Sequence, residues 1–258
     1  MAEQKTIYYS NELNDEFSGI KKQEYQLESN YKYIHNNIFW RFFAFIVYRL
    51  VMTPVAYLYM KFKFDIKIVN RKAMKGYRNS GVFLYGNHTN IPADAYIPNL
   101  ITFPQRSYVI VNSQNVAKKG TRTFMKMVGA LPIPDSFKGM RSFIEAVEKR
   151  SVTDNAIIIY PEAHVWPYYT KIRPYKSTSF RYPVQFSDPV FAFTTTYKKR
   201  KHRKAPKIIV YLDGPFFVNT EIPENLRKDD LRDKVFNAME ERSKNNDVEV
   251  IKYVKKEV

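Results

Sequence analysis

Short apolar segments alternate with amphipathic segments from residue 64 to the end of the chain. The apolar segments have the length and the β-branched or aromatic content of buried strands, and Gly or polar residues follow several of them. They are Phe64–Val69, Val82–Tyr85, Ser107–Val111, Ala156–Tyr160, Val190–Thr196 and Lys207–Leu212, with Gly214-Pro215 expected to end the last. Because strands alternate with helices in this way, we predict an α/β domain with a largely parallel central sheet flanked by helices.

The segments between and after these strands carry helix signals. Pro92 is tolerated in the first turn of a helix, and residues 137–150 place Phe143 and Val147 on one face. Two further helices are predicted at Arg122–Val128 and after Thr220. The charge run KKRKHRK (198–204) lies between two strands and predicts an exposed hairpin loop.

The most apolar and aromatic segment is IFWRFFAFIVYRLVMTPVAYLYMKFKF, which begins at residue 38. Arg41 and Arg49 interrupt it, so it lacks the ~18 uninterrupted apolar residues of a simple spanning helix, and Pro54 is expected to kink or divide it. We favour a membrane anchor that lies in the plane of the interface; a buried pair of core helices and a true span are the alternatives. The predicted organisation is a polar N-terminal extension (1–37), hydrophobic anchor helices (38–63) and a catalytic domain (64–258).

Composition narrows the classes of function. The chain has 258 residues, a net charge of +17 and no cysteine. The basic excess predicts attraction to an anionic lipid surface or to nucleic acid, and the absence of cysteine excludes disulfides, thiolate metal sites and a cysteine nucleophile. The polar, acidic N-terminus lacks the features of a signal peptide. No metal site is expected, since the spacing of His88, Glu162 and His164 matches no zinc signature.

Two polar stretches follow apolar strands, where sites of α/β sheets form. The first is YGNHTNIPAD (85–94) and the second is IIIYPEAHVWP (157–167). His88 is suited to general base catalysis, and a carboxylate such as Asp94 would fix its tautomer. The alternative is structural: Asp94 only caps the helix that Pro92 opens, while His88 bonds to loop backbone.

These stretches resemble the glycerolipid acyltransferase family, that is, the 1-acylglycerol-3-phosphate acyltransferases of the PlsC type. Four blocks occur in the family's order: YGNHTNIPAD, KGTRTFMKMVGALPIPD, IIIYPEAH and DPVFAFTTTY. The resemblance covers roughly residues 38–215. It implies His88 as the base for an acceptor hydroxyl, Asp94 as its orienting partner, and Asn87 and Glu162 as substrate-binding residues. It also implies acyl-CoA or acyl-carrier protein as co-substrate, direct attack without an acyl-enzyme, and no bound cofactor.

The chain departs from the family's pattern at three places. Five residues rather than four separate His88 from Asp94, so we expect the loop to bulge or the helix to begin later. Asp135 ends the second block and Ala163-His164-Val165 continues the third, where the family carries arginine. Arginine binds phosphate through two parallel hydrogen bonds. Arg122 and Arg173, with Lys119, are therefore predicted to bind the acceptor. His164 is predicted to line the site, or else to be an interior histidine bonded to backbone.

The sequence therefore predicts an enzyme that moves a fatty acyl chain to a hydroxyl of a lysophospholipid or related lipid. Its expected place is the cytoplasmic face of the cell membrane, bound peripherally or as a monotopic protein. The alternative is a non-catalytic basic protein on the same scaffold that binds lipid or nucleic acid. Because no nucleic-acid motif accompanies the basic run, we expect the partners to be a membrane lipid acceptor, the acyl donor and an anionic membrane surface.

Overall fold

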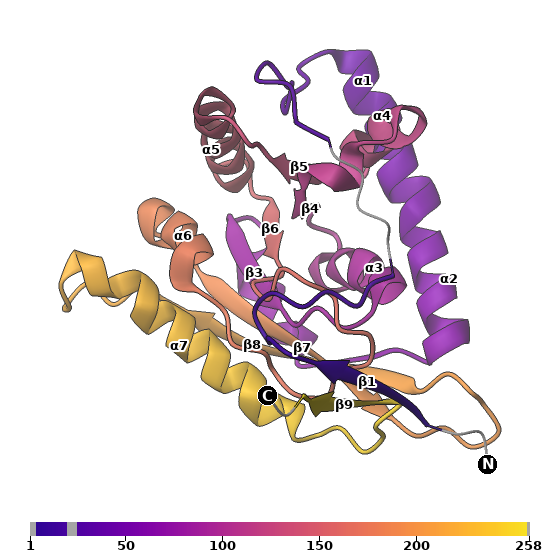
Figure 1. Cartoon of the computed structure of the whole chain (residues 1–258). Coiled ribbons are helices and arrows are strands. Elements are labelled where there is room, and N and C mark those ends of the chain that lie inside the picture. The colour runs from indigo at the N-terminus through magenta and orange to yellow at the C-terminus, as the bar shows by residue number, and fades with distance from the viewer. Residues whose placement is uncertain (1–3, 20–24, 257–258) are drawn as a thin grey trace.

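The computed structural model describes residues 4–19 and 25–256. A seven-stranded sheet, in the order β2-β8-β7-β3-β6-β4-β5, forms the centre of the domain (Figure 1). Neighbouring strands run parallel, apart from the antiparallel pair β7 and β8. The strands are β2 (Lys67–Val69), β3 (Val82–Gly86), β4 (Ser107–Asn112), β5 (Ala130–Ile133), β6 (Ala156–Ile159), β7 (Val190–Lys198) and β8 (Lys207–Phe216). The predicted α/β class and the largely parallel sheet are confirmed.

Helices cover both faces of this sheet (Figure 1). The α-helices are α1 (Ile38–Phe45), α2 (Thr53–Phe64), α3 (Ile91–Thr102), α4 (Lys119–Met127), α5 (Phe137–Ser151), α6 (Arg181–Phe186) and α7 (Glu224–Ser243). A π-helical segment, η1 (Ile46–Met52), joins α1 to α2. Short 3-10 segments are η2 (Arg71–Tyr77), η3 (Ser113–Val116) and η4 (Ser177–Phe180). The four helices predicted from the sequence are present as α3, α4, α5 and α7.

Strand β3 shows why the central strands read as unbroken apolar runs. Phe83 and Tyr85 pack toward one face, in a cluster that includes side chains of α5 and α7. Val82 and Leu84 pack toward the other face, with side chains of α2 and α3. Because both faces are covered, every position of the strand is buried and none is selected to be polar.

Some predicted strand limits were wrong. Phe64 belongs to α2, whose C-cap, Asp65, adopts a left-handed conformation, so β2 begins only at Lys67. Strand β8 continues through Gly214 and Pro215 to Phe216. The sequence also failed to indicate three short strands, namely β5 and the small parallel sheet formed by β1 (Lys5–Tyr9) and β9 (Ile251–Lys255).

The apolar segment is one continuous helix, Ile38–Phe64, and Pro54 does not divide it. The π-helical turns of η1 precede this proline, which occupies the first turn of α2, where its missing N–H is tolerated. The helix is long and apolar enough to cross a membrane. Only 17% of its 18-residue apolar window is buried against the rest of the protein. This low burial contradicts the alternative of a buried core helix pair.

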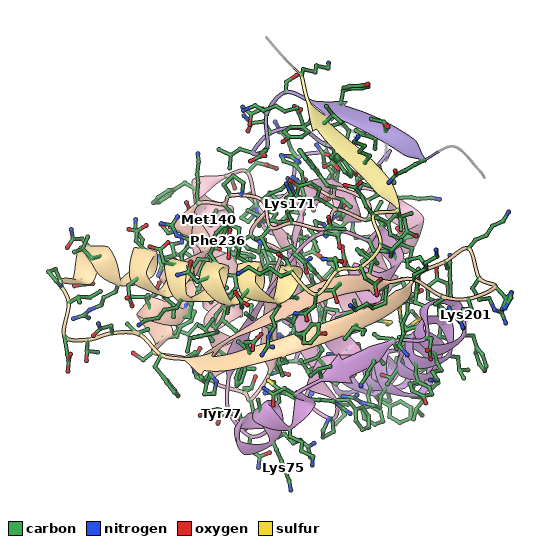
Figure 2. All side chains as sticks on the ribbon, turned by 90° about the horizontal axis from the view of Figure 1, so that it is seen from below. Lys75, Tyr77, Met140, Lys171, Lys201 and Phe236 are labelled. Atoms are coloured by element: carbon green, nitrogen blue, oxygen red, sulfur yellow. The ribbon has the colours of Figure 1, made fainter. Side chains whose placement is uncertain are left out.

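A strand near each end of the chain pairs with the other, and the basic run is exposed. β1 pairs with β9, so the N-terminal extension is attached to the C-terminal end of the domain. Residues 201–204 connect β7 to β8 and are solvent-exposed, which confirms the predicted hairpin loop. Figure 2 shows Lys201 on this loop, projecting from the end of the two long strands.

Candidate active site

The two polar stretches meet at the carboxyl edge of the sheet. β3 and β6 are parallel neighbours, so the loops after Gly86 and Ile159 leave the sheet side by side. The backbone N–H of His88 donates to Oε2 of Glu162 at 3.1 Å, and that of Trp166 donates to the carbonyl of His88 at 3.1 Å. The fold therefore holds the His88 loop on the Glu162 loop through both side-chain and backbone hydrogen bonds.

Asp94 reaches His88 despite the additional residue between them. Asn90 is the N-cap of α3, and its side chain accepts from the backbone N–H of Ala93. This cap places Asp94 in the first turn, where Oδ2 lies 2.7 Å from Nδ1 of His88 and accepts from the backbone N–H of Asn90 at 2.8 Å. One carboxylate thus serves both roles weighed from the sequence, capping the helix and partnering the histidine.

The environment distinguishes the two members of this pair. Asp94 is 2% exposed, and burial raises its pKa, opposed by hydrogen bonds from His88 and from the backbone of Asn90. The side chain of His88 is 21% exposed. Because Nδ1 faces the buried carboxylate, it carries the donated proton, and Nε2 is the ring nitrogen left to accept another.

Tyr160 fixes the plane of the imidazole. Its ring stacks on that of His88 with a centroid separation of 4.5 Å and an interplanar angle of 21°. Its hydroxyl donates to the backbone carbonyl of Asp94 at 2.6 Å, so the tyrosine touches both members of the pair. Sequence reasoning missed this residue, although its position directly before Pro161-Glu162 was a usable signal.

Glu162 is the centre of a buried ionic cluster. Its Oε2 lies 3.2 Å from Nη2 of Arg173, and its Oε1 accepts from the backbone N–H of Arg173 at 3.1 Å. Both side chains are essentially inaccessible to solvent. The guanidinium of Arg173 also donates to the carbonyls of Glu12 and His164 and lies over the ring of Trp166. The structure therefore gives Arg173 an interior role in bracing the loop, in place of the predicted contact with acceptor phosphate.

Three other predicted site residues form contacts with neighbouring parts of the protein. Asn87 is buried and bonds through both amide atoms to the backbone of Thr195, so it ties the loop to β7. His164, predicted to line the site or else to bond to backbone, has Nδ1 3.0 Å from Oε2 of Glu16, a carboxylate of the N-terminal extension. Arg122 lies over Tyr25 and donates to the carbonyl of Val116.

Lys119 and Asp135 lie at the start of α4 and after β5. Lys119 is the first residue of α4, and its side chain lies outside the described part of the structure. Asp135, which stands where the family carries arginine, accepts from the backbone N–H of Leu27 at 3.4 Å. Among the described residues, no group of three or more His, Asp or Glu side chains could hold a metal ion.

Comparison with known proteins assigns the chain to a family. A family model described as Acyltransferase matches residues 65–196, just over half of the chain, including His88, Asp94 and Glu162. The chain belongs to the acyltransferase family. A search of the curated proteins gives no match. Among solved structures, the chain is similar to the 1-acyl-sn-glycerophosphate (LPA) acyltransferase PlsC from Thermotoga maritima, with a TM-score of 0.58 and 14% identity over 81% of this chain and 89% of that chain.

The turn after Tyr160 contains a residue with an uncommon backbone conformation. Ala163 adopts a φ of 62°, in the left-handed region that favours glycine. The backbone N–H of Ala163 bonds to the carbonyl of Tyr160, and that of His164 bonds to the carbonyl of Glu162. These two backbone hydrogen bonds hold the turn that follows Tyr160.

Proposed function

We propose that this protein transfers a fatty acyl chain from a thioester of coenzyme A or acyl-carrier protein to a hydroxyl of a lysophospholipid or related lipid. The observation that carries the proposal is the 2.7 Å contact between Nδ1 of His88 and Oδ2 of Asp94, inside the segment that matches the acyltransferase model. A buried carboxylate on one ring nitrogen orients the imidazole and leaves the other nitrogen as a base.

The reaction proceeds by direct attack. Nε2 of His88 removes the proton from the acceptor hydroxyl as the oxygen adds to the thioester carbonyl. The tetrahedral intermediate then collapses with loss of the thiolate, which takes the proton from the imidazolium. Asp94 stabilises the imidazolium between these steps, and the chain has no cysteine to form a thioester-linked acyl-enzyme.

We further propose that the Ile38–Phe64 helix docks flat on the membrane surface. Its inner side is attached to the domain along its length: the hydroxyl of Tyr48 bonds to that of Ser107 at 2.7 Å, and Thr53 bonds to Asn99. Its outer side exposes large apolar residues, among them Phe39, Phe42, Phe43, Leu50 and Phe62. A helix fixed to a polar domain in this way can insert one face into the interface but cannot cross the bilayer without breaking these contacts.

An assay of the purified protein tests the activity. Acyl-CoA and acyl-carrier protein are each supplied with a panel of lysophospholipids, and both the free thiol and the acylated product are measured. Stoichiometric thiol and product support the proposal and identify the donor and acceptor. Salt-sensitive binding to anionic vesicles without any product would instead favour the non-catalytic alternative.

The docking mode has its own test. Replacing exposed Phe42 by Asp should weaken binding to vesicles by at least about tenfold, because burying a phenylalanine contributes roughly 1.5–3 kcal/mol. The matched control is Phe217→Asp, also an exposed phenylalanine but outside the helix. Equal vesicle affinity for both variants would contradict docking through this face.

A further inference from the structure

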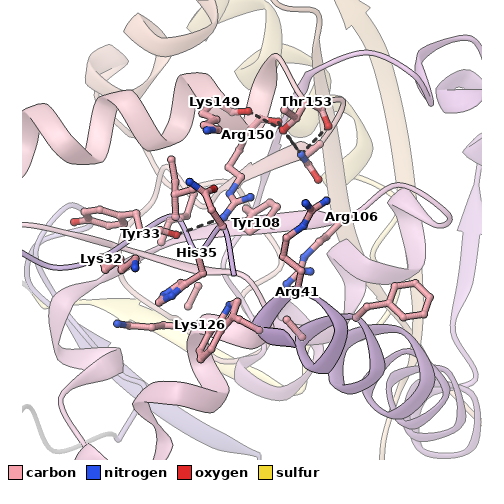
Figure 3. A pocket seen from close by; sticks show the side chains of 18 of the residues that line it. Lys32, Tyr33, His35, Arg41, Arg106, Tyr108, Lys126, Lys149, Arg150 and Thr153 are labelled. Carbon is pink, nitrogen blue, oxygen red and sulfur yellow. Dashed lines mark hydrogen bonds between the residues drawn. The ribbon is translucent and has the colours of Figure 1, made fainter. Parts of the chain in front are cut away.

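Figure 3 shows the side chains that line a cavity of about 600 Å³. Its lining includes Arg106, Ala130 and Asn155, which precede or begin β4, β5 and β6 at their amino ends. His88 follows the carboxyl end of β3, and these four strands are parallel. The cavity is therefore a separate site from the candidate active site, bounded by α1, residues 31–36 and the ends of α4 and α5.

The lining of this cavity is strongly cationic. Six basic side chains line it, and none of the residues that line it is Asp or Glu. They are Lys32, Arg41, Arg106, Lys126, Lys149 and Arg150. Within residues 4–19 and 25–256, none of the six forms an ion pair with a carboxylate. Glu28, a carboxylate whose charge acts on Lys126, is instead paired with Arg122.

The two innermost guanidinium groups are only partly satisfied. Arg106 and Arg150 lie against the same ring, that of Tyr108, at 5.1 and 4.4 Å from its centroid. Each donates one hydrogen bond to a backbone carbonyl, of Met127 and Tyr33 respectively. The Nε atoms of both are buried and have no hydrogen-bond partner in the described part of the chain.

Burial and mutual repulsion disfavour the charged forms of the basic groups in this cavity. Burial lowers the pKa of Arg150, and the charges of Arg106 and Arg41 lower it further. Burial likewise lowers the pKa of His35, which stacks on Trp40 at the same cavity, and Lys126 and Lys32 add to the effect. Like charges gathered without a counter-ion are stabilised when an anion binds among them.

We propose that this cavity binds a phosphate group. Arginine forks and lysine ammonium groups match phosphate oxygens in geometry and charge, and the cavity presents both kinds of donor from several elements (Figure 3). The phosphate belongs either to the headgroup of an anionic lipid or to a small soluble phosphate ester. The position favours the headgroup, because Arg41 and Trp40 are on α1, whose exposed Phe39 and Phe42 lie on the apolar docking helix. The site goes beyond the proposed acyl transfer and uses none of its residues.

The test compares two triple variants with the same loss of charge. The pocket variant is Arg41→Gln/Lys126→Gln/Lys149→Gln, all partly or fully exposed, and the control is Lys201→Gln/Arg203→Gln/Lys204→Gln in the exposed β7–β8 loop. Thermal unfolding shows first that both variants are folded. Arg150→Gln is the second pocket variant, used if the triple variant unfolds.

Two probes distinguish the sources of phosphate. Pyrophosphate is titrated calorimetrically as the soluble probe, and vesicles of phosphatidylcholine with or without phosphatidic acid supply the headgroup. We expect saturable binding of at least one probe by the wild type and the loop variant, and at least about tenfold weaker binding by the pocket variant. Binding limited to phosphatidic acid vesicles assigns the lipid headgroup, and binding of pyrophosphate assigns a soluble ester. The proposal is overturned if the wild type binds neither probe saturably, or if both triple variants lose affinity equally.

Discussion

Replacing Asp94 by Asn removes one negative charge from the candidate site while preserving the shape of the side chain. Oδ2 of Asp94 accepts from Nδ1 of His88 at 2.7 Å and from the backbone N–H of Asn90 at 2.8 Å. An amide oxygen in the place of Oδ2 could still accept both of these bonds, but it carries no negative charge to stabilise the imidazolium. A hydrogen bond to a charged partner contributes about 1.5–3 kcal/mol. The rate of acyl transfer should therefore fall by about 10- to 150-fold.

The matched control for this variant is Asp188→Asn. Asp188 is a partly buried carboxylate that accepts a hydrogen bond from the hydroxyl of Ser151, and burial raises its pKa. It precedes β7 at the amino edge of the sheet, away from His88. Product formation is measured at saturating donor and acceptor for protein that retains its unfolding transition. Full activity in Asp94→Asn, or an equal loss in Asp188→Asn, would refute the role given to Asp94.

Two further predictions concern stability. Burial raises the pKa of Asp94 above its ordinary value of 3.8. The folded protein therefore holds the carboxyl proton of Asp94 more tightly than the unfolded chain does. The free energy of unfolding falls as pH rises from the unfolded pKa through the raised pKa of the folded state. Denaturant titrations at several pH values should show wild type losing stability relative to Asp94→Asn as pH increases; a constant difference contradicts the shift. Arg173→Met leaves the buried carboxylate of Glu162 uncompensated and should cost about 3–5 kcal/mol, whereas Arg242→Met, which breaks a partly exposed pair with Asp213, should cost at most about 1 kcal/mol. Similar losses in the two variants would show that the Glu162 cluster is not the main brace of the loop.

The sequence predicted the central strands well because burial on both faces removes polar residues from them. It did not predict β5, since the four residues Ala130–Ile133 include a proline and carry no alternating pattern. The pairing of β1 with β9 joins segments about 240 residues apart in the chain, so no local pattern indicates it. The continuous course of the apolar helix was also missed, because a proline usually ends a helix and the preceding π-helical turns cannot be read from residue type.

The candidate site shows the same division between local and tertiary information. His88 and Asp94 could be named from position after a strand and at the start of a helix. The structural role of Arg173 could not be predicted in this way. Its charge suggested an exposed ligand for phosphate, whereas the fold buries it against Glu162. Likewise, Glu16 is far from His164 in the chain, and only the folded extension brings the two together. Residue type indicated the chemistry of each group, but its partner was decided by tertiary packing.

The most direct test of the account is the rate of acyl transfer by His88→Ala, measured with the donor and acceptor that give the highest wild-type turnover. His202→Ala is the control, since that histidine lies on the exposed β7–β8 loop. Loss of a general base should lower the rate by about 100-fold or more, with His202→Ala unchanged and both variants folded. Turnover by His88→Ala equal to that of the wild type would contradict the central claim that this imidazole deprotonates the acceptor.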